Sequence, residues 1–469
     1  MIWIFFLGLF AVVVLVRIPF LSQPFVGEEG SFAYLIAGQP ASSTLTPDGL
    51  PQMMIGMLDG TPALYPFQRT IAPYVLLENG PGAVIRALDI QHYSEVWRYV
   101  IIRSAYLALY LMGVAGVLWR CARQAAGQNY LPMVIVLFAC VTPLAVGASI
   151  QPQIDGALGI CLLGLASLLL TLGPQKRSLK HRQFCTFLAG AFIGLGRHEW
   201  VISFLAAGVI LGLALLAYKA RRDVWYLSLR IGAFFCLGLI ATTVLSFALS
   251  PSEYLSGFAV QQRVTGIVNP LILLKRDDEF VIAAVLLLGL LGVLLFLRRR
   301  HILETAPGVL VVSGAAFVQC AGAAATGWPG DGFPRYYAPV FVLAATALIY
   351  LTSYHRDDVV RPNVWVGYAL SGVFLLLTVI AITPMIDDVG ERVSISSNRG
   401  VSLQALEQHY DDVAEIWRAD PDRAPLALID AGIWGRHPEV SFLGKDMGLD
   451  SGYQYLQEFH PNWAERLDN

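Results

Sequence analysis

Long apolar runs separated by short polar segments occupy most of this chain. Because a helix needs about 20 apolar residues to cross the hydrocarbon core of a bilayer, each run is a candidate membrane span. Such spans begin near Ile2, Val100, Leu131, Ile154, Phe184, Trp200, Leu229, Phe280, Ala306, Ala338 and Val364. The pattern predicts an all-α polytopic membrane bundle of about eleven transmembrane helices.

Two of these runs need a separate interpretation. Residues 1–16 are apolar and end at Arg17, without the basic start and the small-residue cleavage site of a signal peptide. We expect an uncleaved first helix there. The run from Phe184 is short and stops at Arg197-His198-Glu199. A turn at the membrane face fits this, and a pair of half-length or re-entrant helices is the alternative.

The basic residues of the short loops predict the orientation. One set of loops holds 14 Lys and Arg residues, and the opposite set holds 5. The first set comprises Arg120, Arg123, Lys176, Arg177, Lys180, Arg182, Lys219, Arg221, Arg222, Arg298, Arg299, Arg300, Arg356 and Arg361. Cytoplasmic loops are enriched in Lys and Arg, so we expect this set and the N-terminus to be cytoplasmic. Residues 17–99 and the C-terminal tail are then exported.

Composition separates the apolar body from the tail. Charged residues make up only 14% of the chain, against about 25% in soluble proteins, and the mean hydropathy is +0.59. From Pro384 onward there are 16 acidic and 7 basic residues, whereas the preceding part holds 18 and 25. We predict a transmembrane domain at residues 1–383 and a small soluble exported domain at residues 384–469.

The two exported segments have different expected structures. The first exported loop, residues 17–99, contains many apolar residues, so we expect short helices lying along the membrane interface. The tail combines helical spacing over residues 401–418 with a strand-like run at residues 425–430, which predicts a small α/β domain. The six cysteines lie in apolar runs or their basic flanks, and we interpret them as buried structural thiols rather than as disulfides or zinc ligands.

The first candidate for chemistry is the pair Glu28 and Glu29, which lies between glycines about ten residues after the first helix. Desolvation at a membrane surface raises the pKa of a carboxylate toward neutrality, where the group can act as a general base. A solvated turn is the alternative. Asp155 precedes an apolar helix, where it is either a second active-site carboxylate or an acid that caps the helix.

Basic candidates follow later in the chain. Arg197 and His198 lie between two apolar runs, where charged groups are costly and an arginine can bind a phosphate. The alternative is an interfacial turn anchored by Trp200. Arg335 and Tyr336 enter a helix from a loop rich in Gly and Pro, and anion binding or interfacial anchoring both fit.

The expected topology places all of these groups on one membrane face. Carboxylates that activate a hydroxyl and arginines that hold a phosphate leaving group are the parts needed for group transfer from a lipid phosphate. The sequence shows no chain of ionisable residues in the middle of a span and no inverted repeat of broken helices, which are features of pumps and transporters.

The order of these motifs resembles the GT-C superfamily of integral membrane glycosyltransferases, in particular the protein O-mannosyltransferases and the lipid A aminoarabinose transferases. The segment Arg17-Ile-Pro-Phe, with Gly27-Glu28-Glu29 and Tyr34-Leu-Ile-Ala after it, is similar to the family's motif after the first helix. Glu28 stands where the family usually has Asp, which leaves the choice of base between Glu28 and Glu29 open. Gln153-Ile-Asp155-Gly and Arg335-Tyr336-Tyr-Ala-Pro resemble two later motifs.

The resemblance implies an inverting transfer of a sugar from a polyprenyl-phosphate donor to a hydroxyl of a glycan, lipid or protein. It implies that Glu28, Glu29 and Asp155 are catalytic, and that Arg197, His198, Arg335 and Tyr336 bind the donor phosphate. Tyr34 and Arg69 would belong to the substrate loop. Some members use a divalent metal, for which Glu29 and Asp155 are the candidate ligands here, so metal use stays open. The expected location is a bacterial inner membrane.

Three other functions remain alternatives. A transporter or lipid-carrier flippase predicts charged residues along a path through the bilayer. An O-antigen ligase or polymerase-type transferase would rely on arginines and a histidine in a late outer loop. A non-catalytic membrane scaffold needs none of these features.

Overall fold

The computed structural model describes residues 1–23, 55–58, 61–64, 76–77, 80–90, 93–151, 154–171, 179–196, 198–249, 278–325, 338–352 and 364–391, with a few positions between 408 and 419. The helices are α1 (Ile2–Leu15), α5 (Pro81–Ala87), α6 (Glu95–Ala126), α7 (Leu131–Val141), α8 (Pro143–Ile150), α9 (Gly159–Leu170), α10 (Leu179–Gly194), α11 (His198–Ala217), α12 (Arg222–Leu249), α14 (Asp278–Thr305), α15 (Pro307–Ala325), α16 (Ala338–Thr352) and α17 (Val364–Glu391). A 3₁₀ turn (Ile18–Phe20), a π-helical turn (Ile154–Leu158) and the strands β1 (Ile55–Leu58) and β2 (Thr61–Leu64) complete the described elements.

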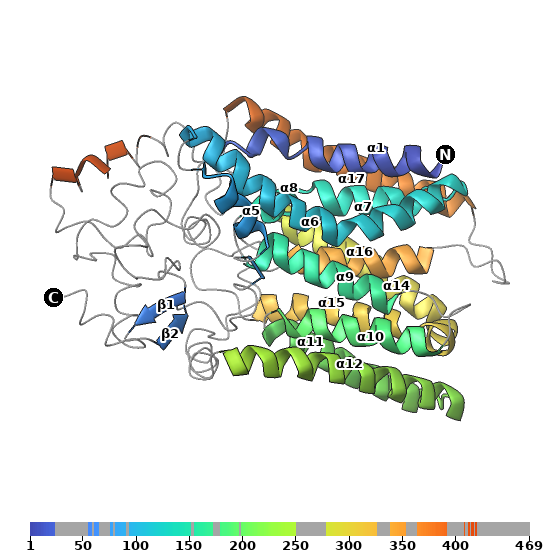
Figure 1. Cartoon of the computed structure of the whole chain (residues 1–469). Coiled ribbons are helices and arrows are strands. Elements are labelled where there is room, and N and C mark those ends of the chain that lie inside the picture. The colour runs from blue at the N-terminus through green and yellow to red at the C-terminus, as the bar shows by residue number, and fades with distance from the viewer. Residues whose placement is uncertain are drawn as a thin grey trace.

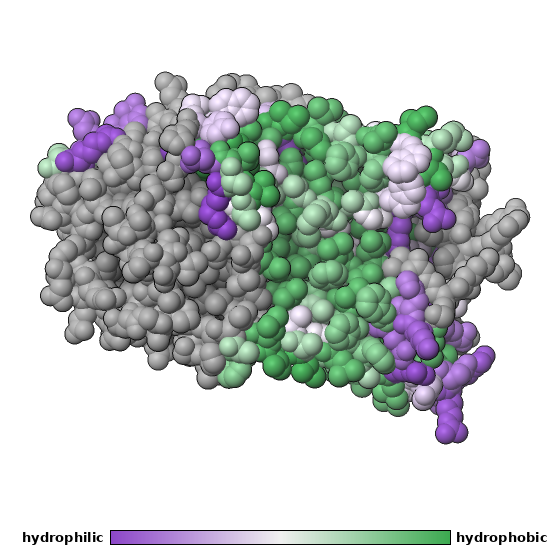
Figure 2. Space-filling model, viewed as in Figure 1, coloured by the Kyte–Doolittle hydropathy of each residue, from purple (hydrophilic) through white to green (hydrophobic). Residues whose placement is uncertain are grey.

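Most of the helices lie side by side in one bundle, and α5 and the β1–β2 hairpin lie at one end of it (Figure 1). Figure 2 shows a band of apolar side chains across the middle of the helices, with hydrophilic side chains beyond it at the end that holds the N-terminus. This is the distribution expected when lipid surrounds the bundle.

A described helix occurs at each of the eleven predicted positions. By length and composition four described helices can cross a membrane, namely Ile2–Phe20, Val96–Ala126, Trp200–Ala217 and Arg222–Leu245. Other apolar helices are shorter, among them Leu131–Val141, Pro307–Gly322 and Ala338–Thr352. The helical bundle is therefore confirmed, whereas the number of membrane crossings stays a prediction.

The run that begins at Leu131 forms two helices, where the sequence predicted one. Thr142 has extended backbone angles (φ −59°, ψ 146°) because a residue before proline avoids the helical region. Its hydroxyl accepts a hydrogen bond from the Ala145 amide (3.4 Å), which caps α8. The break at Pro143 leaves the last carbonyls of α7 without helical partners.

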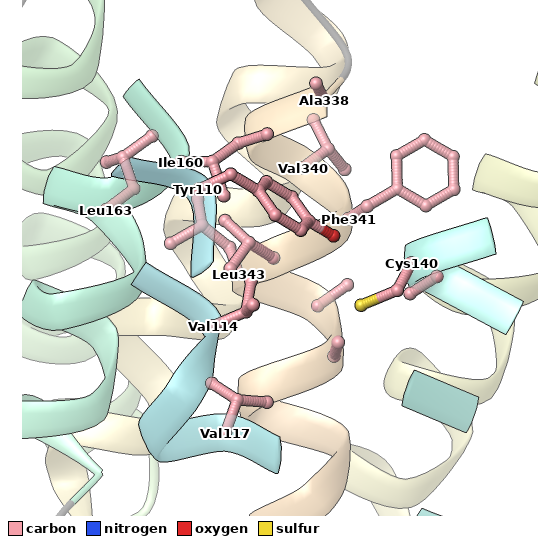
Figure 3. Close-up of a cluster of buried hydrophobic side chains, with 14 of the residues drawn as sticks. Tyr110, Val114, Val117, Cys140, Ile160, Leu163, Ala338, Val340, Phe341 and Leu343 are labelled. Carbon is pink, nitrogen blue, oxygen red and sulfur yellow. The ribbon is translucent and has the colours of Figure 1, made fainter. Parts of the chain in front are cut away.

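Helix α16 forms the centre of the bundle, since all its residues from Ala338 to Leu351 are buried. A helix that is apolar on every side belongs in the interior, and α16 contacts α15, α9, α14 and α7. Figure 3 shows side chains of α16, including Val340 and Leu343, among Tyr110 and Val114 of α6 and Ile160 of α9.

The two segments that we predict to be exported are described only in part. Within the first loop the structure shows the short helix α5, with Ile85 buried and Val84 exposed, and its position at a membrane interface stays a prediction. It also shows an antiparallel β1–β2 hairpin, which we did not expect. Helix α17 continues through Pro384 to Glu391. The described positions between 408 and 419 are helical, and the strand expected at residues 425–430 lies outside the described residues.

Candidate active site

Arg17, directly after α1, is completely buried. Its Nε donates to Ser149 Oγ (2.6 Å), its Nη1 to the Val13 carbonyl (2.6 Å), and its Nη2 to the Cys140 carbonyl (2.7 Å). The guanidinium also lies 4.5 Å from the centre of the Tyr110 ring. The Cys140 carbonyl is available because α7 ends at Val141. The break between α7 and α8 therefore creates acceptors for the buried arginine, which fastens the end of α1 to this break.

Arg103 is the second buried arginine and lies on α6, with 2% of its surface exposed. Its Nε donates to the carbonyl of Gln23 (3.0 Å), and its Nη1 donates to the carbonyl of Ile150 (3.2 Å). Ile150 is the last residue of α8, so this carbonyl is one that the helix leaves unpaired. One side chain thus holds two stretches of chain that are far apart in the sequence.

This contact brings together the beginnings of two segments that carry candidate carboxylates. Glu28 and Glu29 follow Gln23 by five and six residues, and Asp155 follows Ile150 by five. Five residues of extended chain span at most about 18 Å. The acidic candidates of both segments are therefore within reach of a common point beside Arg103.

Asp155 lies in the π-helical turn, and its neighbour Gly156 has non-helical backbone angles. A methyl group on Gly156 would overlap the carbonyl oxygen of Ala148, so the turn packs against α8 as only glycine permits. Helix α9 starts at Gly159 with Leu158 at its N-cap and no side-chain cap hydrogen bond. Asp155 lies three residues before Leu158, and its two interpretations, a second active-site carboxylate and an acid that caps the helix, both stay predictions.

Helix directions bring the basic candidate segments to the same end of the bundle. Asn129, in the turn after α6, donates to the carbonyl of Thr352 (2.8 Å), so α16 ends beside the C-terminal end of α6, which carries Arg120 and Arg123. Ala338 then lies about 21 Å away, at the opposite end, and Arg335 and Tyr336 precede it by three and two residues in the sequence. Helix α10 also starts at the basic end and runs for 16 residues, so α11 begins at His198 on the side of Asp155.

The structure describes some of the site residues that the sequence predicted and leaves others outside the described part. The backbones of Asp155 and His198 are described. Outside the described residues lie Glu28, Glu29, Tyr34, Arg69, Arg197, Arg335 and Tyr336. Trp200 is 3% exposed and packs in the core, so it is not a lipid-facing interfacial anchor. Among the described side chains, no group of three His, Cys, Asp or Glu residues could hold a metal ion.

Sequence reasoning missed Arg103. A signal was present, because Arg103 is the single charged residue in the apolar run 99–119, and such residues are costly unless they have a structural or functional partner. Arg17 was noted as part of a motif, but its network of carbonyl acceptors depends on the helix break at Pro143.

The fold is similar to that of a known GT-C enzyme. ArnT from Cupriavidus metallidurans, a lipid A aminoarabinose transferase, matches in its apo state with a TM-score of 0.58 and 14% identity, over 94% of this chain and 85% of that chain. The structure of ArnT from the same organism bound to undecaprenyl phosphate matches with a TM-score of 0.56 and 14% identity, over 93% of this chain and 85% of that chain. Comparisons with protein-family models and with curated protein sequences find no match. The expected resemblance to the lipid A aminoarabinose transferases is confirmed as a shared fold.

Proposed function

We propose that this protein is an integral membrane glycosyltransferase that moves a sugar from a polyprenyl-phosphate donor to an acceptor hydroxyl. The observation that carries the proposal is the double contact of Arg103, which ties Gln23 and Ile150 together at the start of two acid-bearing segments. The similarity of the fold to an ArnT structure bound to undecaprenyl phosphate supports the class of donor.

The proposed reaction uses groups from both segments. Glu28 or Glu29 removes the proton of the acceptor hydroxyl, and the oxygen attacks the anomeric carbon of the sugar. The bond from this carbon to the phosphate oxygen breaks with inversion, and polyprenyl phosphate leaves. Asp155 is the second carboxylate of the site, while Arg197, His198, Arg335 and Tyr336 hold the phosphate as its charge develops. Tyr34 and Arg69 contact the substrates from the first exported loop.

The distribution of buried charge favours a transferase over a transporter. Among the described residues, the charged side chains that are buried are Arg17 and Arg103. Both lie at the end of the bundle where the acidic segments start, rather than along a path from one end to the other. A flippase or transporter would need polar groups at successive depths.

The same arrangement supports the orientation that we propose. The end of α6, the start of α10 and the turn between α11 and α12 lie at one end of the bundle (Figure 1) and hold the basic residues Arg120, Arg123, Lys180, Arg182, Lys219, Arg221 and Arg222. By the enrichment of cytoplasmic loops in Lys and Arg, we place that end and the N-terminus in the cytoplasm. The site, residues 17–99 and the tail at residues 384–469 then face the periplasm of a bacterial inner membrane.

The test uses the full chain in nanodiscs with a panel of radiolabelled polyprenyl-phosphate sugars. Wild type is expected to release sugar from one donor, and Glu28→Gln, Glu29→Gln and Asp155→Asn are compared with it. We expect at least one variant from each segment to lose about 100-fold or more in rate. Asp223→Asn, at the opposite end of the bundle, is the matched control and should keep its activity. Unchanged sugar release in all three site variants would refute the assignment.

Metal use is tested in the same assay. Chelation of divalent ions before the reaction should abolish sugar release if Glu29 and Asp155 hold a catalytic metal, and re-addition of one ion should restore it. The anomeric configuration of the product, read by NMR, distinguishes inversion from retention.

A further inference from the structure

A small cleft of about 50 Å³ opens at the basic end of the bundle, opposite the candidate active site. It lies between the end of α9, the start of α10, the first turns of α12 and the junction of α14 with α15. Its polar lining includes Thr171, His181, Arg182 and Thr186, and its apolar lining includes Leu170 and Ile231. The cleft thus combines the basic residues Arg182 and His181 with an apolar wall.

The polar side of this cleft favours an anion. Arg182 is half-buried in the first turn of α10, and His181 beside it is exposed. On the facing wall Arg120 donates to Thr171 Oγ1 (2.8 Å), which places a third basic side chain against the cleft. The start of α15 at Pro307 also lines it. The N-terminal ends of α10 and α15 carry positive partial charge and the C-terminal ends of α9 and α14 carry negative partial charge, so the attraction for an anion comes from the basic side chains.

The two helices α10 and α12 that line the cleft also carry exposed apolar side chains on other faces. Phe184 on α10 is 59% exposed, and Tyr226 and Leu229 on α12 are each 65% exposed. These side chains would be unfavourable in water and suit contact with acyl chains. A free phosphate would use only the cations, whereas a phospholipid would use the cations and this surface together.

We infer that the cleft binds the phosphate headgroup of an anionic phospholipid, with Arg182 and His181 at the phosphate and the acyl chains along α10 and α12. Basic pockets between transmembrane helices on the cytoplasmic side commonly bind such headgroups. The nearby acid Glu304 interacts with Arg221 and is not part of the lining. The inference does not depend on the transferase reaction, because the cleft lies at the other end of the bundle.

The experiment measures lipid binding to the detergent-purified full chain by native mass spectrometry. Phosphatidylglycerol is titrated against the wild type, Arg182→Gln and Arg299→Gln. Arg299 is the matched control, since it lies at the same end and, within the part of the chain that the structure describes, contacts the Phe296 carbonyl and ring of its own helix. We expect Arg182→Gln to bind phosphatidylglycerol about tenfold more weakly than wild type, and Arg299→Gln to bind it as wild type does.

Further measurements distinguish a bound phospholipid from bound inorganic phosphate. Phosphatidylcholine should bind weakly, and inorganic phosphate should not compete with phosphatidylglycerol at millimolar concentration. Ile231→Trp keeps every charge but fills the cleft, so it should block binding if Arg182→Gln proves too unstable to measure. Equal losses in Arg182→Gln and Arg299→Gln, or competition by inorganic phosphate, would overturn the inference. Binding of both lipids with equal affinity would also overturn it.

Discussion

Arg17 and Ser149 lie 132 positions apart in the chain and are joined by a buried hydrogen bond of 2.6 Å from Nε to Oγ. Ser149 in turn donates to the carbonyl of Val146 (2.7 Å), so its hydroxyl is oriented by its own helix before it accepts from the arginine. The pair joins the end of α1 to α8, and the first exported loop and the π-helical turn both begin close to it.

Replacing Arg17 tests how much this junction contributes to the stability of the fold. Arg17→Leu leaves the carbonyls of Cys140 and Val13 without their buried donor, so we expect the free energy of unfolding to fall by about 3 kcal/mol. The six cysteines are all buried or half-buried, so a thiol-reactive dye reports unfolding in detergent. Ser149→Ala removes one acceptor of the Arg17 side chain and should lower the free energy of unfolding by about 1 kcal/mol. A double-mutant cycle that shows no coupling between the two changes would contradict the contact.

Arg103 is expected to matter more for activity than its distance from the chemistry suggests. In Arg103→Gln the carbonyls of Gln23 and Ile150 lose a common donor, so both acid-bearing segments shift relative to each other. Displacements of about 1 Å cost around 100-fold in rate, and we expect a fall of that size in kcat with a smaller change in KM. Arg123→Gln, an exposed arginine on the same helix, serves as the control. A change confined to KM would argue against a positioning role.

The sequence predicted helices well because the hydrophobic signal is long and repeated. The helix positions need only counts of apolar residues, and a helix was found at each expected position. The sequence analysis missed the division between α7 and α8 because the apolar run continues across Pro143. The pair Thr142-Pro143 indicates this break, since a residue before proline avoids the helical region. The β1–β2 hairpin was also missed, although Asp59-Gly60 between the strands is a strong two-residue turn signal.

The candidate site could be predicted only as a set of residue types on one face. Which carbonyls Arg17 and Arg103 contact depends on where α7 and α8 end, and these ends are set by tertiary packing as well as by local preference. Gly156 shows the same limit. The sequence shows Gly156 only as the residue after Asp155, and the structure shows that the carbonyl of Ala148 occupies the space where a side chain would go.

Gly156→Ala tests the close packing of the π-helical turn on α8. The added methyl group meets the Ala148 carbonyl, and backbone cannot move aside as a flexible side chain can. We expect a destabilisation of about 1–3 kcal/mol, with loss of sugar transfer because Asp155 moves with the turn. Gly208→Ala in α11 has open space around the new methyl group and should be neutral or stabilising by up to about 1 kcal/mol. Similar melting temperatures for the two variants would exclude this packing.

Helices α10 and α12 are expected to depend on glycine for their contact. Gly238 of α12 faces the backbone of α10 so closely that a methyl group would overlap the Phe187 carbonyl, whereas Gly232 on the same helix has open space around it. Small residues let membrane helices approach closely, and van der Waals packing supplies most of the attraction between them. We therefore expect Gly238→Ala to lower stability by about 2 kcal/mol and Gly232→Ala to leave it unchanged. Because both substitutions add the same group to one helix, helix propensity cancels in the comparison. A difference in the dye-detected melting temperature then reports the helix contact alone, and equal values would mean that α10 and α12 are further apart than the structure places them.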